Sequence, residues 1–401
     1  MNGLVESGEI EWRDVRNVQS HGGAVGQIAG MVDFRLLRRF VVVLVLAHLA
    51  VRSAVAQQAP FDTSTWDIRA AESRIEPYRG RSALLLRNGT AWLKGSRFEN
   101  GTIEFDVAFA EGVSFPGIAF RAVSRADYEL LYMRANQSGG SHATQYTPVL
   151  HGLYGWQIYT GPAFEAAVQW TYDRWMHVKL VVSGTRAELY VDSDTAVQVI
   201  PRLRGADAAG EIGFVVVPGS ARFANVILRP ESAPLLAAAP PRIRDSEPVT
   251  AIHSWRVSAP FAESSLIGIT APASVAGSAW SNLDVEERGI ANLARLSAHD
   301  SSHNTVVAAV TLDARRATTV RMRFGFSDRV RVFLNGKLLY AGNDGFGTRD
   351  ADFLGTVGLF DELELPLRRG RNELWFAVSE TFGGWAITAD LPDRSGIRVS
   401  P

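Results

Sequence analysis

The amino-acid sequence predicts an all-β protein in which two β-sandwich domains are joined by a linker rich in proline and alanine. Two observations indicate the fold class. Short runs that alternate apolar and polar residues recur after residue 57 between turns rich in Gly, Asn and Asp, and no long amphipathic helix interrupts them. A third observation concerns the domain number, because 401 residues exceed the usual length of one domain. We therefore expect domains at 57–230 and 251–401, with residues 231–250 as the linker.

Composition and charge limit the classes of function. The chain carries 41 Lys and Arg against 42 Asp and Glu, a formal net charge of -1, so no basic excess attracts a nucleic-acid backbone and we expect no nucleic-acid partner. The absence of cysteine excludes disulfides, thiolate metal sites and cysteine nucleophiles. A content of 36 Gly and 10 Trp suits a β-rich protein that meets flat ligands such as sugars.

The N-terminal segment predicts export. Residues 31–56 combine a basic start, an apolar stretch at 40–51 and the small-residue cleavage site Ala54-Val55-Ala56, which are the three parts of a signal peptide. About a dozen apolar residues are fewer than the ~20 that span a bilayer, so we expect no membrane span in the mature chain from Gln57. An uncleaved anchor or a buried helix is the alternative.

Residues 1–30 precede the basic start, where a signal peptide has no polar extension. We interpret them as an extension upstream of the true initiator, Met31. Export of a chain without cysteine fits a bacterial periplasmic or secreted protein, since secreted eukaryotic chains of this size usually carry disulfides.

In the first domain, residues 102–109 show the clearest strand pattern. Their alternation directs Ile103, Phe105, Val107 and Phe109 toward a core and leaves Glu104 and Asp106 on the other face. Further strands are predicted from runs of β-forming residues at 175–182, 186–191, 213–217 and 221–227. Asn88-Gly89 and Asn100-Gly101 are predicted to form hairpin turns.

In the second domain, Asn335-Gly336 separates two apolar runs within residues 330–340, which is a strong signal of a β-hairpin. Residues 363–378 predict another pair of strands with a turn between them. Pro366 lies in the first of these strands and favours an edge position, because proline cannot donate a hydrogen bond to a neighbouring strand.

Two regions resemble known domain families. Residues 98–107, 117–121, 128–134 and 175–191 carry the first resemblance, which extends over about residues 65–230. This region resembles the concanavalin A-like, laminin-G-like jelly-roll domains, in the variant found in bacterial 3-keto-disaccharide hydrolases and family-sixteen-like glycoside hydrolases. Residues 328–337, 365–374 and 382–385 carry the second, over about residues 250–398, which resembles the galactose-binding-like β-sandwich of bacterial glycosidases. Both resemblances imply jelly-roll sandwiches and a carbohydrate ligand, and both folds serve binding proteins as well as enzymes.

Three carboxylates are candidates for catalysis if the chain is a hydrolase: Glu104, Asp106 and Glu129. Retaining glycosidases need two carboxylates about 5 Å apart, which the laminarinase-type enzymes place on one strand as Glu-x-Asp-x-x-Glu. Here Phe109 stands at the position of the second glutamate, so the acid/base of that pattern is missing. Solvated strand carboxylates are the alternative interpretation of Glu104 and Asp106.

The stretch from 121 to 156 is denser in groups that bind sugars. Arg and amide side chains hydrogen-bond sugar hydroxyls, and aromatic rings stack on the apolar face of a pyranose. The candidate ligand-binding residues are Arg121, Tyr132, Arg134, Gln145, Tyr146, His151 and Trp156. Strict alternation places Tyr128, Leu130, Tyr132 and Arg134 on one face of a strand and Glu129 on the other. An internal Arg–Glu pair with packed aromatics is the alternative.

Signals for metal ions and other chemistries are weak. Asp344, Asp350 and Asp352 cluster near Arg349 and could bind Ca²⁺, which takes several carboxylate oxygens; a polar surface loop is the alternative, and no other cofactor is expected. His299 and His303 are four residues apart but lack the helix that makes this spacing a zinc signal. The sequence contains no Gly-x-Ser-x-Gly and no His-Glu-x-x-His motif, which disfavours a serine hydrolase and a zinc protease.

These observations lead to three hypotheses. The first is an exported protein whose jelly roll binds an oligo- or polysaccharide, with the second sandwich as an accessory domain. The second is a glycoside hydrolase of the 3-keto-disaccharide hydrolase type. The third is a structural or adhesive protein of the cell envelope without catalytic activity.

Overall fold

The computed structural model describes residues 56–239, 250–266, 268, 271, 275, 279–350 and 352–401, and residues 56–401 belong to one compact unit. The predicted extension at 1–30, nearly all of the predicted signal peptide and residues 240–249 of the predicted linker lie outside these residues. The described residues form β-strands and short 3₁₀ turns, which confirms the all-β class. No helix among them is long and apolar enough to cross a membrane.

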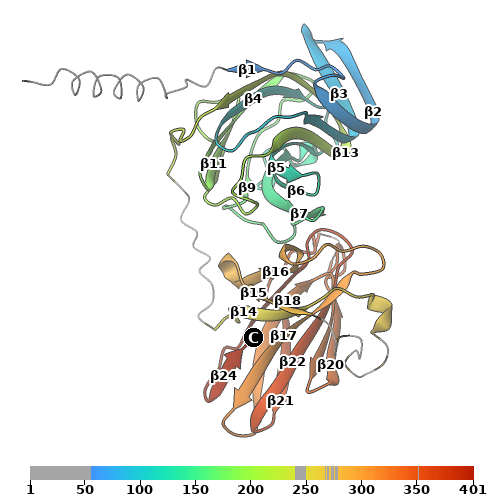
Figure 1. Cartoon of the computed structure of the whole chain (residues 1–401), viewed down its shortest axis with the longest axis vertical. Coiled ribbons are helices and arrows are strands. Elements are labelled where there is room, and N and C mark those ends of the chain that lie inside the picture. The colour runs from blue at the N-terminus through green and yellow to red at the C-terminus, as the bar shows by residue number, and fades with distance from the viewer. Residues whose placement is uncertain are drawn as a thin grey trace, which may run out of the picture. The chain divides into compact units, whose positions relative to one another are not determined.

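Thirteen antiparallel strands build the first sandwich (Figure 1). The main strand order is β12-β11-β10-β4-β13-β5-β6-β7-β8, while β1 and β3 also pair with β13, β2 with β3, and β9 with β7. The strands are β1 (Gln57–Gln58), β2 (Trp66–Tyr78), β3 (Arg81–Leu93), β4 (Gly101–Ala108), β5 (Pro116–Ser124), β6 (Asp127–Met133), β7 (Thr144–Leu150), β8 (Leu153–Tyr154), β9 (Glu165–Ala166), β10 (Met176–Ser183), β11 (Arg186–Val191), β12 (Gln198–Ile200) and β13 (Glu211–Pro230).

The long strand β13 connects the two layers of this sandwich. Its first half pairs with β5 and its second half with β4, and β3 follows both halves on the other side. The sequence predicted two separate strands at 213–217 and 221–227. They are instead one strand interrupted by an irregularity between Val216 and Ser220, where Gly219 has a φ of +100°. Buried aromatic rings fill the space between the layers, among them the stacked pair Phe214 and Phe223.

The predicted alternation in β4 is confirmed, and both hairpin turns predicted in the first domain are wrong. Gly101 starts β4, which does not pair with the preceding strand β3, so Asn100-Gly101 is not the turn of a hairpin. Ile103, Phe105 and Val107 are buried in the core of the first sandwich. Asn88-Gly89 does not form a hairpin turn but lies inside β3, and the turn of that hairpin falls at residues 79–80. A side chain at Gly89 would collide with the backbone of Ala70 on β2, so the glycine permits close approach of the two strands.

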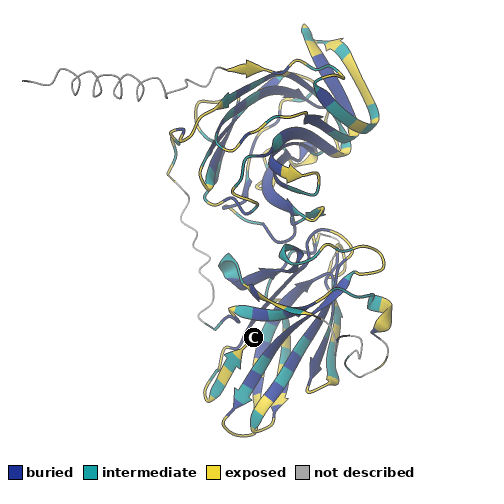
Figure 2. Cartoon of the chain, viewed as in Figure 1, coloured by how far each residue is buried: buried dark blue, intermediate teal, exposed yellow. Residues whose placement is uncertain are grey.

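Two sheets form the second sandwich. A seven-stranded sheet has the order β15-β14-β17-β22-β19-β20 with β24 beside β17, and a four-stranded sheet has the order β16-β23-β18-β21. The strands are β14 (Ser254–Ser258), β15 (Trp280–Asp284), β16 (Ile290–Asn292), β17 (Thr305–Ala314), β18 (Thr318–Ser327), β19 (Arg329–Leu334), β20 (Lys337–Asn343), β21 (Asp361–Leu367), β22 (Gly370–Ser379), β23 (Ala386–Asp390) and β24 (Ile397–Ser400). Buried and exposed residues alternate along several of these strands (Figure 2).

The hairpin predicted at Asn335-Gly336 is confirmed, because β19 pairs with β20 across it and both turn residues have positive φ. Pro366 lies on β21, which is an edge strand as expected. However, β21 and β22 belong to different sheets, so the segment 363–378 crosses between the layers rather than forming a hairpin.

The first and second sandwiches share a buried junction. Ile290, Val357 and Ala386 of the second sandwich belong to the hydrophobic core of the first. Gln157 is fully buried at this junction: its backbone N–H donates to the carbonyl of Gly383 at 3.0 Å, and its side-chain Nε2 donates to the carbonyl of Leu354 at 2.9 Å. The hydroxyl of Ser327 donates to its Oε1 at 3.0 Å. This junction fixes segment 155–159 against the loops of the second sandwich.

Candidate binding pocket

A pocket with a volume of about 340 Å³ lies where the end of β6 meets the loops of the second sandwich. Such a volume is in the range of small-ligand sites. The first sandwich contributes Arg134, His142, Trp156, Thr160, Gly161 and Glu165, and the second contributes Asp352, Phe353, Leu354 and Thr356.

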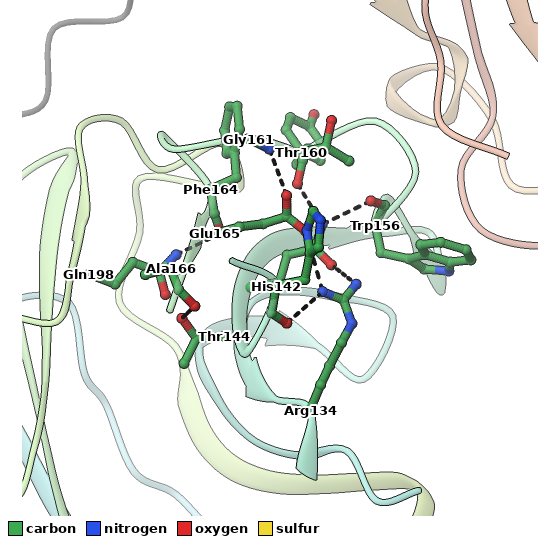
Figure 3. A network of polar contacts seen from close by, with 12 residues as sticks. Arg134, His142, Thr144, Trp156, Thr160, Gly161, Phe164, Glu165, Ala166 and Gln198 are labelled. Atoms are coloured by element: carbon green, nitrogen blue, oxygen red, sulfur yellow. Dashed lines mark hydrogen bonds and ion pairs between the residues drawn. The ribbon is translucent and has the colours of Figure 1, made fainter. Parts of the chain in front are cut away.

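Strand pairing brings the polar groups of the pocket together. Arg134 follows β6 directly and His142 lies shortly before β7, to which β6 is paired. Glu165 starts the two-residue strand β9, which pairs with β7 on its other side. Residues separated by up to 31 positions in the sequence therefore meet at one end of a layer, where Figure 3 shows Arg134 and His142 directed toward Glu165.

Glu165 is the centre of this polar group. Its carboxylate is only 4% exposed and accepts a hydrogen bond from the backbone N–H of Gly161 at 2.7 Å, and His142 Nδ1 lies 2.8 Å from its Oε1. Arg134 Nη1 lies 3.3 Å from the same carboxylate oxygen as His142. The His142 side chain is 46% exposed, so this ring joins the buried network to the pocket.

A second set of hydrogen bonds, to Tyr132 and Gln145, fixes the position of the Arg134 guanidinium. Its Nη2 donates to the hydroxyl of Tyr132 at 2.9 Å and also to Oε1 of Gln145. Gln145 is fully buried and its Nε2 donates to the carbonyls of Trp156 and Tyr159 at 2.9 and 2.6 Å. Burial raises the pKa of Tyr132 well above its usual range, so the phenol stays neutral. The guanidinium and the backbone of Trp156 are thus held in fixed positions.

The predicted alternation along β6 is confirmed, and it explains which candidates meet. One face of β6 contributes Tyr128, Leu130 and Tyr132 to a small hydrophobic cluster outside the main core. The other face contributes Leu131 and Met133 to the main core. Of the seven sequence-predicted binding residues, Arg134 and Trp156 line the pocket, and Tyr132 and Gln145 lie behind them in the hydrogen bonds that fix Arg134 and the Trp156 carbonyl.

The other three predicted binding residues lie elsewhere. Arg121 is 1% exposed, and its guanidinium donates to the carbonyls of Glu99 and Gly184 at 2.7 and 2.6 Å. The phenol of Tyr146 is fully buried and donates to Glu129. His151 Nδ1 lies 2.8 Å from the carbonyl of Ala294 at the junction.

The three carboxylates predicted for catalysis do not form one site. Glu104 pairs with Arg229 on the outer face of β4, and Asp106 lies 3.0 Å from His177 Nδ1 and 2.8 Å from Arg81. Glu129 is 1% exposed on the core side, where it accepts hydrogen bonds from Tyr146 and from the backbone N–H of Gly205. Burial raises the pKa of Glu129.

The acidic cluster predicted for calcium is engaged in other contacts. Asp344 forms a bidentate ion pair with Arg349, with both N–O distances at 2.9 Å, and Asp350 Oδ1 accepts the backbone N–H of Asp352. Within the described ranges no group of three or more His, Asp or Glu side chains could hold a metal ion. His303 bonds Asp300, whereas His299 lies edge-on to Trp385.

Two central residues of the pocket, His142 and Glu165, were not singled out from the sequence. His142 lies in a Ser- and Gly-rich stretch typical of a turn, and Glu165 lies in a segment without strand periodicity. The pairing of β9 with β7 brings Glu165 to the pocket, and a two-residue strand leaves no pattern in a sequence.

The sequence matches no protein-family model and no curated protein. Among solved structures, the chain is similar to the carbohydrate-binding module CBM66 from Bacillus subtilis, with 16% identity, a TM-score of 0.33 and coverage of 40% of this chain and 93% of that one. It is also similar to a native glycosidic hydrolase (14% identity, TM-score 0.34, 45% and 98% coverage) and to the β-glucanase of Bacillus licheniformis (10%, 0.31, 44% and 98%). These likenesses are too distant to assign an activity.

Proposed function

We propose that the chain is an exported carbohydrate-binding protein, and that the pocket around Glu165 receives one sugar unit of its ligand. The observation that carries this proposal is the combination of a fixed carboxylate, a guanidinium and a half-exposed imidazole in one pocket that Trp156 also lines. A sugar hydroxyl is both a donor and an acceptor, so it can pair with acceptors such as Glu165 and donors such as Arg134. The indole offers an apolar surface for the C–H face of a pyranose.

The charges in the pocket favour a neutral sugar over an acidic one. Arg134 is already paired with Glu165, so the two formal charges compensate each other. Asp352 adds a carboxylate at the exposed rim. Among the residues that line the pocket, Arg134 is the one Arg or Lys, so an anionic sugar would meet this negative rim opposite a cation that is already paired.

Hydrolysis has less support from the geometry. Glu104 and Asp106 are engaged with Arg229, His177 and Arg81 on a different layer from the pocket, and Glu129 is enclosed. A glycosidase needs two carboxylates flanking one glycosidic bond. The pocket itself holds Glu165 and Asp352, but Glu165 is only 4% exposed and paired with Arg134, so Asp352 is the one exposed carboxylate among the lining residues. Binding without turnover is therefore the better-supported function.

A glycan array combined with a hydrolysis assay tests this function, each with and without Ca²⁺. We expect binding of a neutral glycan without release of product, and loss of binding in Arg134→Ala. Thermal melting of this variant checks that it folds. Turnover that disappears in Glu104→Gln or Glu129→Gln would establish the hydrolase, and a folded wild type that binds no glycan would favour an envelope scaffold.

A further inference from the structure

The rim of the pocket continues into exposed aromatic rings of the second sandwich. Phe346 lies in the loop between β20 and β21, and Phe382 in the loop between β22 and β23; they are 60% and 62% exposed. Both lie next to Trp156, whose ring centroid is 6.5 Å from that of Phe346 and 5.6 Å from that of Phe382. We call these three rings the aromatic shelf.

Apolar side chains that are exposed singly are ordinary on a folded protein, whereas a contiguous group of them marks contact with a ligand or partner. Within the described residues, the large apolar side chains classed as exposed include three phenylalanines, Phe346, Phe360 and Phe382, and all belong to loops at the end of the second sandwich that meets Gln157. Leu354, which lines the pocket, is also 37% exposed. The shelf is therefore continuous with the pocket through Trp156, which belongs to both.

The three rings do not form one flat platform. Phe382 and Phe346 are inclined to the indole of Trp156 by 59° and 68°, so they are not stacked face to face with it. The apolar face of a pyranose ring packs on the face of an aromatic ring. Successive units of an oligosaccharide therefore need separate aromatic faces, which these inclined rings offer. The polar groups of the pocket, by contrast, lie at its base around Glu165.

We propose that the aromatic shelf is a second sugar subsite, which binds the unit next to the one held in the pocket. This inference rests on the proposed function and specifies its ligand as an oligosaccharide of at least two neutral units. It also gives the second sandwich a direct role in binding, because Phe346 and Phe382 supply the subsite and residues 352–356 supply one wall of the pocket.

Titration calorimetry with ligands of increasing length tests the subsite. The probes are glucose, xylose and mannose, together with laminari-, cello-, xylo- and manno-oligosaccharides. We expect the wild type to bind the two-unit form of its preferred sugar about 10-fold more tightly than the single unit, which corresponds to ~1.4 kcal/mol. Phe382→Ala should remove this gain and leave the single-unit affinity unchanged, while Leu235→Ala, at an apolar side chain 92% exposed, should retain both.

Each other outcome identifies what fails. A gain that persists in the double variant Phe346→Ala/Phe382→Ala overturns the subsite, as does an equal loss of affinity for single units and chains. A wild type that binds all lengths equally overturns the subsite and leaves the proposed function intact. A wild type that binds none of the probes and no glycan of the array overturns both the subsite and the proposed function. A protein partner would then be the occupant to test for the aromatic shelf.

Discussion

Two clusters of the first sandwich contain the same three kinds of side chain. In the pocket, His142 lies 2.8 Å from Glu165, whose carboxylate is 4% exposed, and Arg134 lies 3.3 Å away. On the outer face of β4, His177 lies 3.0 Å from Asp106, whose carboxylate is 5% exposed, and Arg81 lies 2.8 Å away. In both clusters the imidazole is about half exposed.

The surroundings of the two clusters differ. The Glu165 cluster has an indole and a loop of the second sandwich around it and lines a pocket. The Asp106 cluster receives a further hydrogen bond from Asn225 at 2.6 Å and lies beside the Glu104–Arg229 ion pair, so its polar groups bind one another across neighbouring strands. The comparison teaches that a His–carboxylate–Arg group suggests ligand binding only where concavity and an apolar surface accompany it.

The largest expected effect concerns the junction that supports the pocket wall. Burial, together with the charge of Asp328, raises the pKa of Glu380 to about 8, and Ser327 lies between Glu380 and Gln157. The folded protein therefore keeps a proton that the unfolded chain loses near pH 4.5. Stability from this group is complete below pH 4.5 and is lost as the pH rises through about 8.

Urea unfolding between pH 4.5 and 9 measures this effect, and Glu380→Gln, which stays neutral, is expected to flatten the dependence. Because Gln157 fixes the pocket wall, sugar binding should weaken over the same pH range. An unchanged slope in Glu380→Gln would contradict the assignment of the proton to this group.

The next largest expected effect is a difference in sugar affinity between variants of Glu165 and of Asp106. Glu165→Gln removes the acceptor charge at the base of the pocket, and we expect sugar affinity to fall about 100-fold, since hydrogen bonds to charged groups contribute about 1.5–3 kcal/mol. The matched change Asp106→Asn should leave affinity within about twofold and lower only the thermal stability. The opposite pattern in calorimetry would place the binding site on the β4 face.

The smallest expected effect is a difference in glycan affinity between variants of His142 and of His177. His142→Ala is expected to weaken binding about 10-fold, because one half-exposed hydrogen-bonding group is lost while Glu165 stays in place. His177→Ala is the matched control, with a similarly exposed ring beside a buried carboxylate. If the two variants bind the same glycan with equal affinity, His142 does not contact the sugar.

Much of the fold could be predicted from the sequence, because period-2 alternation and Asn-Gly turns are local signals. The hairpin at Asn335-Gly336 and the faces of β4 and β6 follow from such signals. The continuity of β13 could not be predicted in this way, since the irregularity around Gly219 resembles a turn and only pairing with β3 on both sides shows a single strand.

The candidate site could be predicted only in part, for a related reason. Tyr132 and Arg134 share a face of one strand, and Gln145 meets them through pairing of β6 with β7. Glu165 and the residues 352–356 reach the pocket through long-range contacts, which no local pattern records. Arg121 shows the converse: its residue type suggested a sugar ligand, but backbone carbonyls of Glu99 and Gly184 occupy its guanidinium.

Hydrogen–deuterium exchange with and without the preferred oligosaccharide tests the central claim most directly, because it locates the ligand. We predict slower exchange on binding in residues 132–145, 156–166, 345–350, 352–356 and 380–384, with no change in β4 or β10. Protection confined to β4 and β10, around Glu104, Asp106 and His177, would contradict the claim that the Glu165 pocket is the sugar-binding site.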